Sequence, residues 1–128
     1  MADVAVWTNT GLAKVTDLLA SISVITPHWV AWGVLAAVAA AATNTALESA
    51  GAEARTVGTV TQETTTVTND TYRVVGQITC AGAAKTIKEV GLFSHLTTGN
   101  LSMRGTFSDI NMSVGDSITF TVNNVFTR

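Results

Sequence analysis

The sequence predicts a mainly β fold, an antiparallel β-sandwich of jelly-roll-like type with one short N-terminal amphipathic helix. Three observations lead to this prediction. From Arg55 onward the chain is rich in Thr and Val and alternates apolar with polar residues, as half-buried strands do. Turn residues separate these runs at short intervals, which is typical of a sandwich or barrel. Apolar residues at helical spacing occur in a segment near the N-terminus.

The composition describes one domain with an unusual surface. A chain of 128 residues is long enough for a single core, so we expect one domain over residues 1–128. Only 12% of the residues are charged and 47% are hydrophobic, whereas about 25% charged is usual. A soluble monomer with so few charges would have little to keep it dispersed. We therefore expect much of the surface to lie against neighbours in an assembly.

The N-terminal elements follow from local patterns. Residues 4–7 form a short apolar run that predicts a strand, and residues 8–10 offer a helix N-cap. We expect the helix over about residues 11–23, because four apolar residues there share one helical face. They are Leu12, Val15, Leu19 and Ile22.

The middle of the chain carries the strongest compositional signal. Residues 18–47 contain no Asp, Glu, Lys or Arg. Pro27 marks a boundary before a predicted strand at 28–33. Beyond it, the alanines favour helix but β-branched residues and poor caps oppose it. We interpret residues 34–44 as a flexible or interface arm and expect a helical turn at 45–50.

The second half is predicted to be β throughout. A strand-rich segment at 56–68 leads to a tight turn at Asn69-Asp70. Three further strands are expected at 72–80, 86–93 and 101–107, followed by a turn at 113–116. A last strand should bury Ile118, Phe120, Val122 and Phe126. The Thr-rich run 64–68 is either a solvated hairpin arm or a strand offered to a neighbouring subunit.

A charged pair is predicted within two of these strands. Glu89 is in phase with Ile87 and Phe93, which points its carboxylate inward unless Gly91 marks a β-bulge. A buried carboxylate is costly unless it is paired. Arg104, on the next strand, is the natural partner, so we interpret Glu89 and Arg104 as a structural pair rather than as catalytic groups.

No catalytic, cofactor or metal site is predicted. His28, His95 and Cys80 are not at metal-ligand spacing. A nucleophilic pairing of Cys80 with His95 is open by sequence distance, but Cys80 falls on the apolar face of its strand, where a small buried hydrophobe is the simpler interpretation. No Gly-rich phosphate loop is present, and we expect no small-molecule substrate. The protein is therefore predicted not to be an enzyme.

Nucleic-acid and membrane partners are also disfavoured. The formal net charge is −2 and the chain has no basic cluster, so nucleic acid is an unexpected partner. The longest apolar run, residues 29–42, has 14 residues, whereas a membrane helix needs about 20. Three tryptophans remain to be explained, Trp7, Trp29 and Trp32. They are candidates for stacking on a sugar ring, but core or interface anchors are the commoner use.

Several short pieces, in order, resemble the N-terminal domains of tailed-bacteriophage tail fibres. The pieces span residues 8–107. They are Thr8-Asn9-Thr10-Gly11-Leu12-Ala13, Trp29-Val30-Ala31-Trp32-Gly33, Thr45-Ala46-Leu47-Glu48 with Arg55, Ile87-Lys88-Glu89-Val90-Gly91-Leu92-Phe93, and the strand from Gly99 to Phe107. A related group of short phage proteins of capsid-accessory or unassigned role is more similar still, through the hairpin Thr68 to Tyr72 and the segment Gly115 to Ser117. The chain departs from the pattern at Val34-Leu35-Ala36, where relatives tend to have Gly-Thr-Gly.

The resemblance implies a virion structural protein. A tail fibre needs a shaft beyond its attachment domain, and this chain ends at Arg128, which favours a capsid decoration or cement protein located in the virion and assembled in the host cytoplasm. The implied partners are the major capsid protein and further copies of the same chain. The alternatives are a tail, baseplate or fibre-attachment component and a carbohydrate-binding module. We expect contacts to the partner from Trp29, Trp32, Val34, Leu35 and Val38.

Overall fold

The computed structural model is a two-sheet β-sandwich with one helix. It describes residues 4–23 and 25–126; residues 1–3, 24 and 127–128 of the predicted single domain lie outside the described residues. The elements are β1 (Val4–Trp7), α1 (Asn9–Leu19), β2 (Trp29–Gly33), β3 (Thr56–Val57), β4 (Thr59–Glu63), β5 (Thr71–Thr79), β6 (Lys85–Phe93), β7 (Leu101–Met112) and β8 (Ser117–Val125). The predicted mainly β sandwich with one short N-terminal helix is confirmed.

The two sheets are antiparallel and differ in width. Sheet A has five strands in the order β1-β7-β6-β2-β3, and sheet B has three in the order β4-β5-β8. Between β3 and β4 the chain crosses from sheet A to sheet B at Gly58. A Cβ atom there would lie 2.4 Å from Val74 Cγ1, so this close passage needs glycine. One side of the sandwich is therefore closed by the chain itself, while β1 and β8 form the edges of the other side.

The main core fills the space between the sheets. Strand β5 turns its even-numbered residues inward, as the alternation of the sequence predicts. Phe107 and Phe120 meet across the sheets with ring centroids 5.9 Å apart. The buried members of this core are Val30, Trp32, Val74, Ile78, Cys80, Ile87, Leu92, Met103, Met112 and Phe120.

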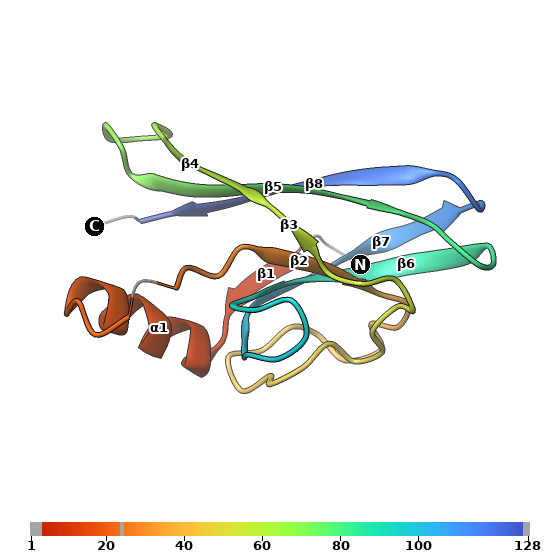
Figure 1. The fold of residues 1–128 in the computed structure, drawn as a ribbon, viewed down its shortest axis with the longest axis horizontal. Coiled ribbons are helices and arrows are strands. Elements are labelled where there is room, and N and C mark those ends of the chain that lie inside the picture. The colour runs from red at the N-terminus through yellow and green to blue at the C-terminus, as the bar shows by residue number, and fades with distance from the viewer. Residues whose placement is uncertain (1–3, 24, 127–128) are drawn as a thin grey trace.

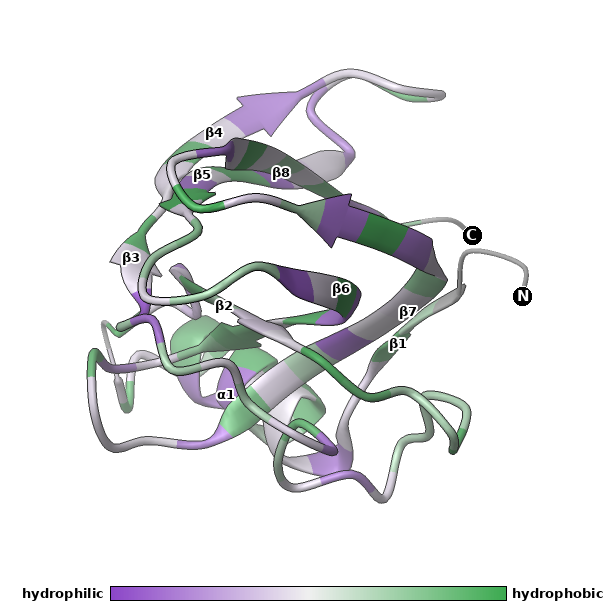
Figure 2. Cartoon of the chain, turned by 90° about the vertical axis from the view of Figure 1, so that its right-hand side faces the viewer, coloured by the Kyte–Doolittle hydropathy of each residue, from purple (hydrophilic) through white to green (hydrophobic). Residues whose placement is uncertain are grey.

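The outer face of sheet A carries a second, smaller core. Helix α1 and the covering loop (residues 34–55) lie against this face, so the molecule has three layers (Figure 1). Figure 2 shows the same order end-on, with sheet B above sheet A and α1 below it. The buried residues of this smaller core are Ala31, Leu47, Phe93 and Leu101, with Trp29 packed against them.

The helix begins and ends earlier than predicted. It spans Asn9–Leu19 rather than 11–23. Thr8 is the N-cap, because its Oγ1 accepts a hydrogen bond from the Gly11 N–H at 2.9 Å. The helix stops because Ala20 and the following residues turn the chain, with Ser21 in the left-handed region at φ 58°.

The helical turn predicted at 45–50 is wrong. That segment is extended enough for Ala50 to form a β-bridge with Gly33. Its backbone groups form hydrogen bonds with other segments rather than with the preceding turn. The Ser49 carbonyl, for example, accepts a hydrogen bond from the Val34 N–H at 2.8 Å. Leu47, 8% exposed, enters the smaller core. Tertiary partners have overridden the helix propensity of the alanines.

The β-rich half matches the prediction with three corrections. The segment predicted as strand at 56–68 divides at Gly58 and ends at Glu63. Strand β7 continues to Met112, beyond the predicted end at Phe107. Phe126, predicted to be buried, is 54% exposed, because it follows the end of β8 at Val125.

The run 64–68 is a loop organised by one carboxylate. Asp70 accepts hydrogen bonds from the N–H groups of Thr65, Thr66 and Val67 at 2.7–2.8 Å. These bonds hold the pKa of Asp70 well below its usual range. Asn69 adopts φ 60°, as the predicted turn requires.

Candidate interaction surface

Arg104 lies at the centre of a buried polar network under the covering loop. It stands on β7 and is 2% exposed, and Glu89 on β6 is 0% exposed. The Arg104 Nε donates to Glu89 Oε2 at 2.6 Å, and its Nη2 lies 3.2 Å from Glu48 Oε2. The structure thus brings the predicted pair into direct contact. The pair faces the covering loop rather than the space between the sheets.

A β-bulge explains this orientation. The β6–β7 register shifts between Ile87 and Glu89, so Ile87 points into the main core while Glu89 points to the outer face. The sequence had suggested Gly91 as the site of such a bulge. The shift lies earlier, between Ile87 and Glu89, and without it Glu89 would point into the main core.

The same network fastens the covering loop. The two terminal nitrogens of Arg104 donate to the carbonyls of Val38 and Ala39 and to Asn44 Oδ1, at 3.1–3.4 Å. Glu89 Oε1 accepts from the Ser49 N–H at 3.1 Å. Residues 34–44 are therefore anchored to sheet A at several points, which argues against the flexible one of the two alternatives predicted for them, a flexible or an interface arm. Their fixed position means that their exposed side chains present a defined surface.

Glu53 anchors the far end of the loop. Its carboxylate accepts from the Trp32 Nε1–H at 2.8 Å and from the Ala81 N–H at 3.0 Å, and it forms an ion pair with Lys85. Burial alone would raise the pKa of Glu53, but Lys85 and these N–H groups outweigh it and lower the pKa from 4.5 to about 2. The sequence pattern does not predict an anchoring role for Glu53, and it includes Glu48 only as part of a motif. The signal available was that they are the first two acids after the charge-free window.

The predicted contact residues divide into buried and exposed ones. Trp32 is 1% exposed and lies in the main core, so its prediction as a contact residue is wrong: its indole is held inside by Glu53. Trp29 and Val34 are half-buried. Leu35 and Val38 are 43% and 61% exposed and are available to a partner.

Helix α1 turns most of its apolar stripe outward. An amphipathic helix normally packs such a stripe against the core, but Leu12, Leu19 and Ile22 are 51%, 82% and 76% exposed. The helix instead approaches β7 through Gly11, its buried residue. A Cβ atom at Gly11 would lie 2.0 Å from the Ser102 carbonyl oxygen. This close approach leaves no room for larger side chains on the inner side.

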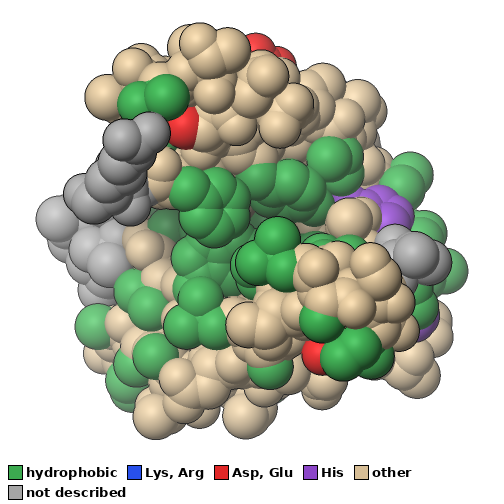
Figure 3. Space-filling view, turned by 90° about the vertical axis from the view of Figure 1, so that its left-hand side faces the viewer, with side chains coloured by type: hydrophobic (Ala, Val, Ile, Leu, Met, Phe, Trp, Pro, Cys, Tyr) green, Lys and Arg blue, Asp and Glu red, His purple; other side chains and the backbone are tan. Residues whose placement is uncertain are grey.

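These residues are exposed apolar side chains on the two elements that cover the outer side of sheet A. We call them together the helix–loop surface: Leu12, Leu19, Ile22, Leu35 and Val38. Helix α1 and the covering loop lie next to each other there (Figure 1), joined by the Asn9 N–H bond to the Ala42 carbonyl at 2.8 Å. Figure 3 shows the end of the molecule at α1, where hydrophobic side chains group across the middle and charged ones are few.

The groups considered for chemistry have other roles in the structure. Cys80 is buried in the main core and its Sγ lies 3.4 Å from the Ala83 carbonyl. His95 Nδ1 lies 3.0 Å from Ser94 Oγ, and His28 Nδ1 lies 2.8 Å from the Thr26 carbonyl. Among residues 4–23 and 25–126, no group of three or more His, Cys, Asp or Glu side chains is placed to hold a metal ion.

The motif residues that carry the phage resemblance have structural positions. Besides capping α1, Thr8 donates to the Leu101 carbonyl at 2.6 Å. Arg55 lies 3.5 Å above the ring of Phe93 and donates to the carbonyls of His95 and Thr98. Burial lowers the pKa of Arg55. The motifs therefore fasten α1, the covering loop and the β6–β7 turn onto sheet A.

Comparison of the chain with models of known protein families, with curated proteins and with solved structures finds no match. In the part of the chain that the structure describes, α1 is too short to cross a bilayer.

Proposed function

We propose that this protein is a non-enzymatic structural subunit of a tailed-bacteriophage virion, a capsid decoration or cement protein that binds between major capsid subunits. The observation that carries the assembly role is the outward apolar stripe of α1. Leu19, the last residue of a helix that contacts β7, is 82% exposed, and Ile22, in the turn that follows the helix, is 76% exposed. The assignment to a phage particle rests on the ordered motifs of the sequence.

The helix–loop surface has the chemistry of a permanent interface. Obligate interfaces are large and hydrophobic, and their cores are depleted of charged residues. The window from Leu18 to Leu47 has no charged side chain, and the charges that anchor it, Glu89 and Arg104, are buried beneath it. Partner subunits that bind to this window meet uncharged side chains.

The anchoring network supports the same function. A loop that orders only on binding would lose affinity to conformational entropy. Here Arg104 and Glu89 already hold residues 38–49 in place. A pre-ordered surface of this kind suits a protein that contributes stability to a shell through buried apolar area, and further copies of the chain are expected around each junction.

Binding to purified expanded shells tests the proposal. Leu19→Asp places a charge in the exposed stripe, and we expect it to weaken binding by about tenfold or more. Ala13→Asp is the matched control, because Ala13 is exposed on the same helix outside the stripe. Equal binding by the two variants would refute the role of the stripe.

The alternative is a tail, baseplate or fibre-attachment component, which the similarity to tail-fibre N-terminal domains favours. Copy number distinguishes the two. Hundreds of copies per particle, counted by quantitative mass spectrometry, are expected of a shell protein. Copy numbers near the low symmetries of a tail, or density on the tail alone in cryo-electron microscopy, would contradict the capsid assignment.

A further inference from the structure

Strand β8 has an unpaired edge without the usual protection. It pairs with β5 along its whole length, from Thr71↔Val125 to Thr79↔Ser117, without a register shift. No strand in the described residues pairs with its other edge. Natural proteins protect such edges with Lys, Pro, bulges or short length. The nine residues of β8 include no charged residue, no Pro and no Gly.

The other sheet edges are protected. Strands β1 and β3, the edges of sheet A, have four and two residues. Strand β4, the opposite edge of sheet B, has five residues and carries Glu63, whose Oε1 lies 3.4 Å from Arg73 Nη1. Among the strands that the structure describes, β8 alone offers a long, regular and uncharged edge.

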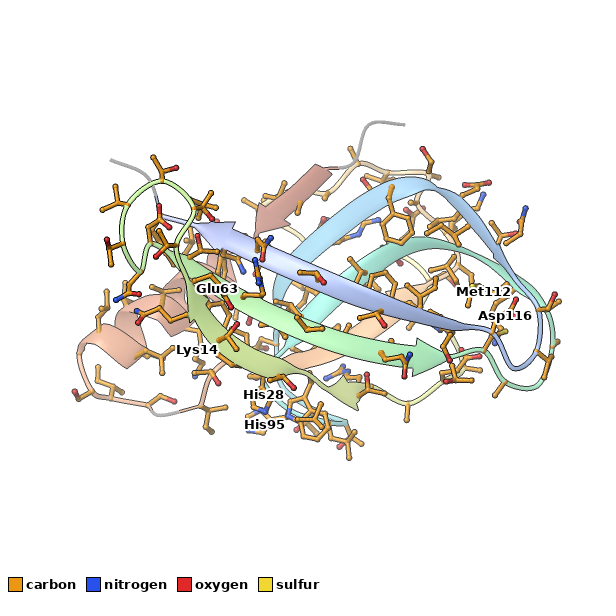
Figure 4. All side chains as sticks on the ribbon, turned by 90° about the horizontal axis from the view of Figure 1, so that it is seen from above. Lys14, His28, Glu63, His95, Met112 and Asp116 are labelled. Atoms are coloured by element: carbon orange, nitrogen blue, oxygen red, sulfur yellow. The ribbon has the colours of Figure 1, made fainter. Side chains whose placement is uncertain are left out.

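An apolar cleft lies directly beside this edge. Sheet A is wider than sheet B, and Figure 4, seen from above sheet B, shows β7 and β1 extending past β8. The cleft has a volume of about 440 Å³ and includes no charged side chain in its lining. Its large apolar members are Val90, Leu92, Met103, Phe107, Ile110, Ile118, Phe120 and Val122. The inner face of sheet A is thus left without a covering strand at this side.

We propose that β8 is a strand-addition site, at which an extended segment of a partner protein pairs with its free edge. A strand added about 4.8 Å from β8 lies over β7, and its alternate side chains point into the cleft. The uncharged lining selects a segment whose inward residues are apolar and uncharged. One occupant therefore accounts for both the bare edge and the adjoining cleft.

A second copy does not fit by pairing its own β8 here. Two antiparallel β8 strands would be related by a two-fold axis perpendicular to sheet B. Each sheet A extends past its own β8 (Figure 4), so the β1 and β7 strands of the two copies would occupy the same space. A separate extended segment meets no such obstacle. The inference goes beyond the proposed function, since it concerns the opposite side of sheet A from the helix–loop surface.

Nuclear magnetic resonance of the full chain with a synthetic peptide tests this site. The probe is an uncharged peptide as long as β8 in which valine and threonine alternate, and the control peptide has the same composition with its valines in one block. We expect the alternating peptide to shift the β8 amide resonances and to slow their hydrogen exchange by about tenfold or more. Absence of both effects up to about 1 mM peptide would overturn the proposal, as would equal effects of the two peptides.

A pair of variants locates the binding. Ala5 is exposed and lines the cleft, so Ala5→Phe fills the cleft from β1 without disturbing the main core. It should weaken peptide binding by about tenfold, whereas Thr59→Phe, on the exposed edge strand β4, should not. Unchanged binding by Ala5→Phe contradicts the site.

Sedimentation of the protein without peptide completes the test. We expect a concentration-independent mass. Self-association that protects the β8 amides would show that a second copy is the occupant and would overturn the proposal of a separate partner segment. Leu19→Asp should leave peptide binding unchanged, so failure of this site and failure of the proposed capsid binding are distinguishable.

Discussion

The two faces of sheet A pack against their neighbouring layers through different kinds of interaction. The inner face meets sheet B mainly through apolar side chains such as Leu92 and Phe120, and its ion pair, Glu53 with Lys85, lies next to the end of β5 at Ala81. The outer face meets the covering loop through a small apolar core and the buried network of Arg104. A sheet can supply an alternating apolar face, but an irregular loop exposes backbone carbonyls that must be bonded. The buried network of Arg104 therefore lies where the sheet meets an irregular loop.

Breaking the Arg104 network should have the largest effect. Glu89→Leu leaves the Arg104 guanidinium buried without its closest partner, and removing one member of a buried pair costs about 3–5 kcal/mol. We expect that loss in the free energy of unfolding, measured by urea denaturation. The double variant with Arg104→Met should regain part of it. If Glu89→Leu alone cost less than a typical surface substitution, the network would not be the anchor of the loop.

The apolar face should respond to a cavity instead. Leu92 is 1% exposed, and Leu92→Ala should lower the free energy of unfolding by about 2–5 kcal/mol. In Leu92→Ala, the amide hydrogens of residues 34–49 should still exchange only through global unfolding. This is not expected of Glu89→Leu. Selective loss of protection in that loop in Leu92→Ala would show that the two faces are not independent.

Gly11 tests how closely α1 must approach sheet A. Alanine favours helix by about 1 kcal/mol over glycine, yet its Cβ would meet the Ser102 carbonyl oxygen at 2.0 Å. We expect Gly11→Ala to destabilise the fold by about 1–3 kcal/mol through overpacking, measured by thermal and urea unfolding. A gain in stability would mean that α1 can shift away from β7 without cost.

Acid should loosen the Glu53 anchor. Its pKa is about 2 in the folded protein and 4.5 as the ordinary value, so the unfolded chain binds more protons between these values. Its contribution is full above about pH 4.5 and is lost as the pH falls through about 2. We expect the urea midpoint of Glu53→Gln to depend less steeply on pH over this window than that of the parent. The Asp70 carboxylate, whose pKa is also lowered, keeps part of the slope in both proteins.

The smallest effect on stability is expected at the helix–loop surface. Leu19 is 82% exposed, so Leu19→Ser should change the free energy of unfolding by no more than about 0.5 kcal/mol. Chemical denaturation provides the measurement. A loss as large as that of Leu92→Ala would show that the exposed stripe of α1 is part of the folded core and not a surface for a partner.

The sequence by itself determined the presence of most strands, the inward face of β5 and the pairing of Glu89 with Arg104. Strand periodicity is a local property, and a carboxylate in phase with apolar neighbours requires a cation nearby. Only the tertiary structure decided the rest. It placed the bulge before Glu89, which moved the pair to the outer face, and it recruited Asn44 and Glu48 to the network. It also buried Trp32 and exposed the stripe of α1, because these outcomes depend on which surfaces the chain brings together and not on any local pattern.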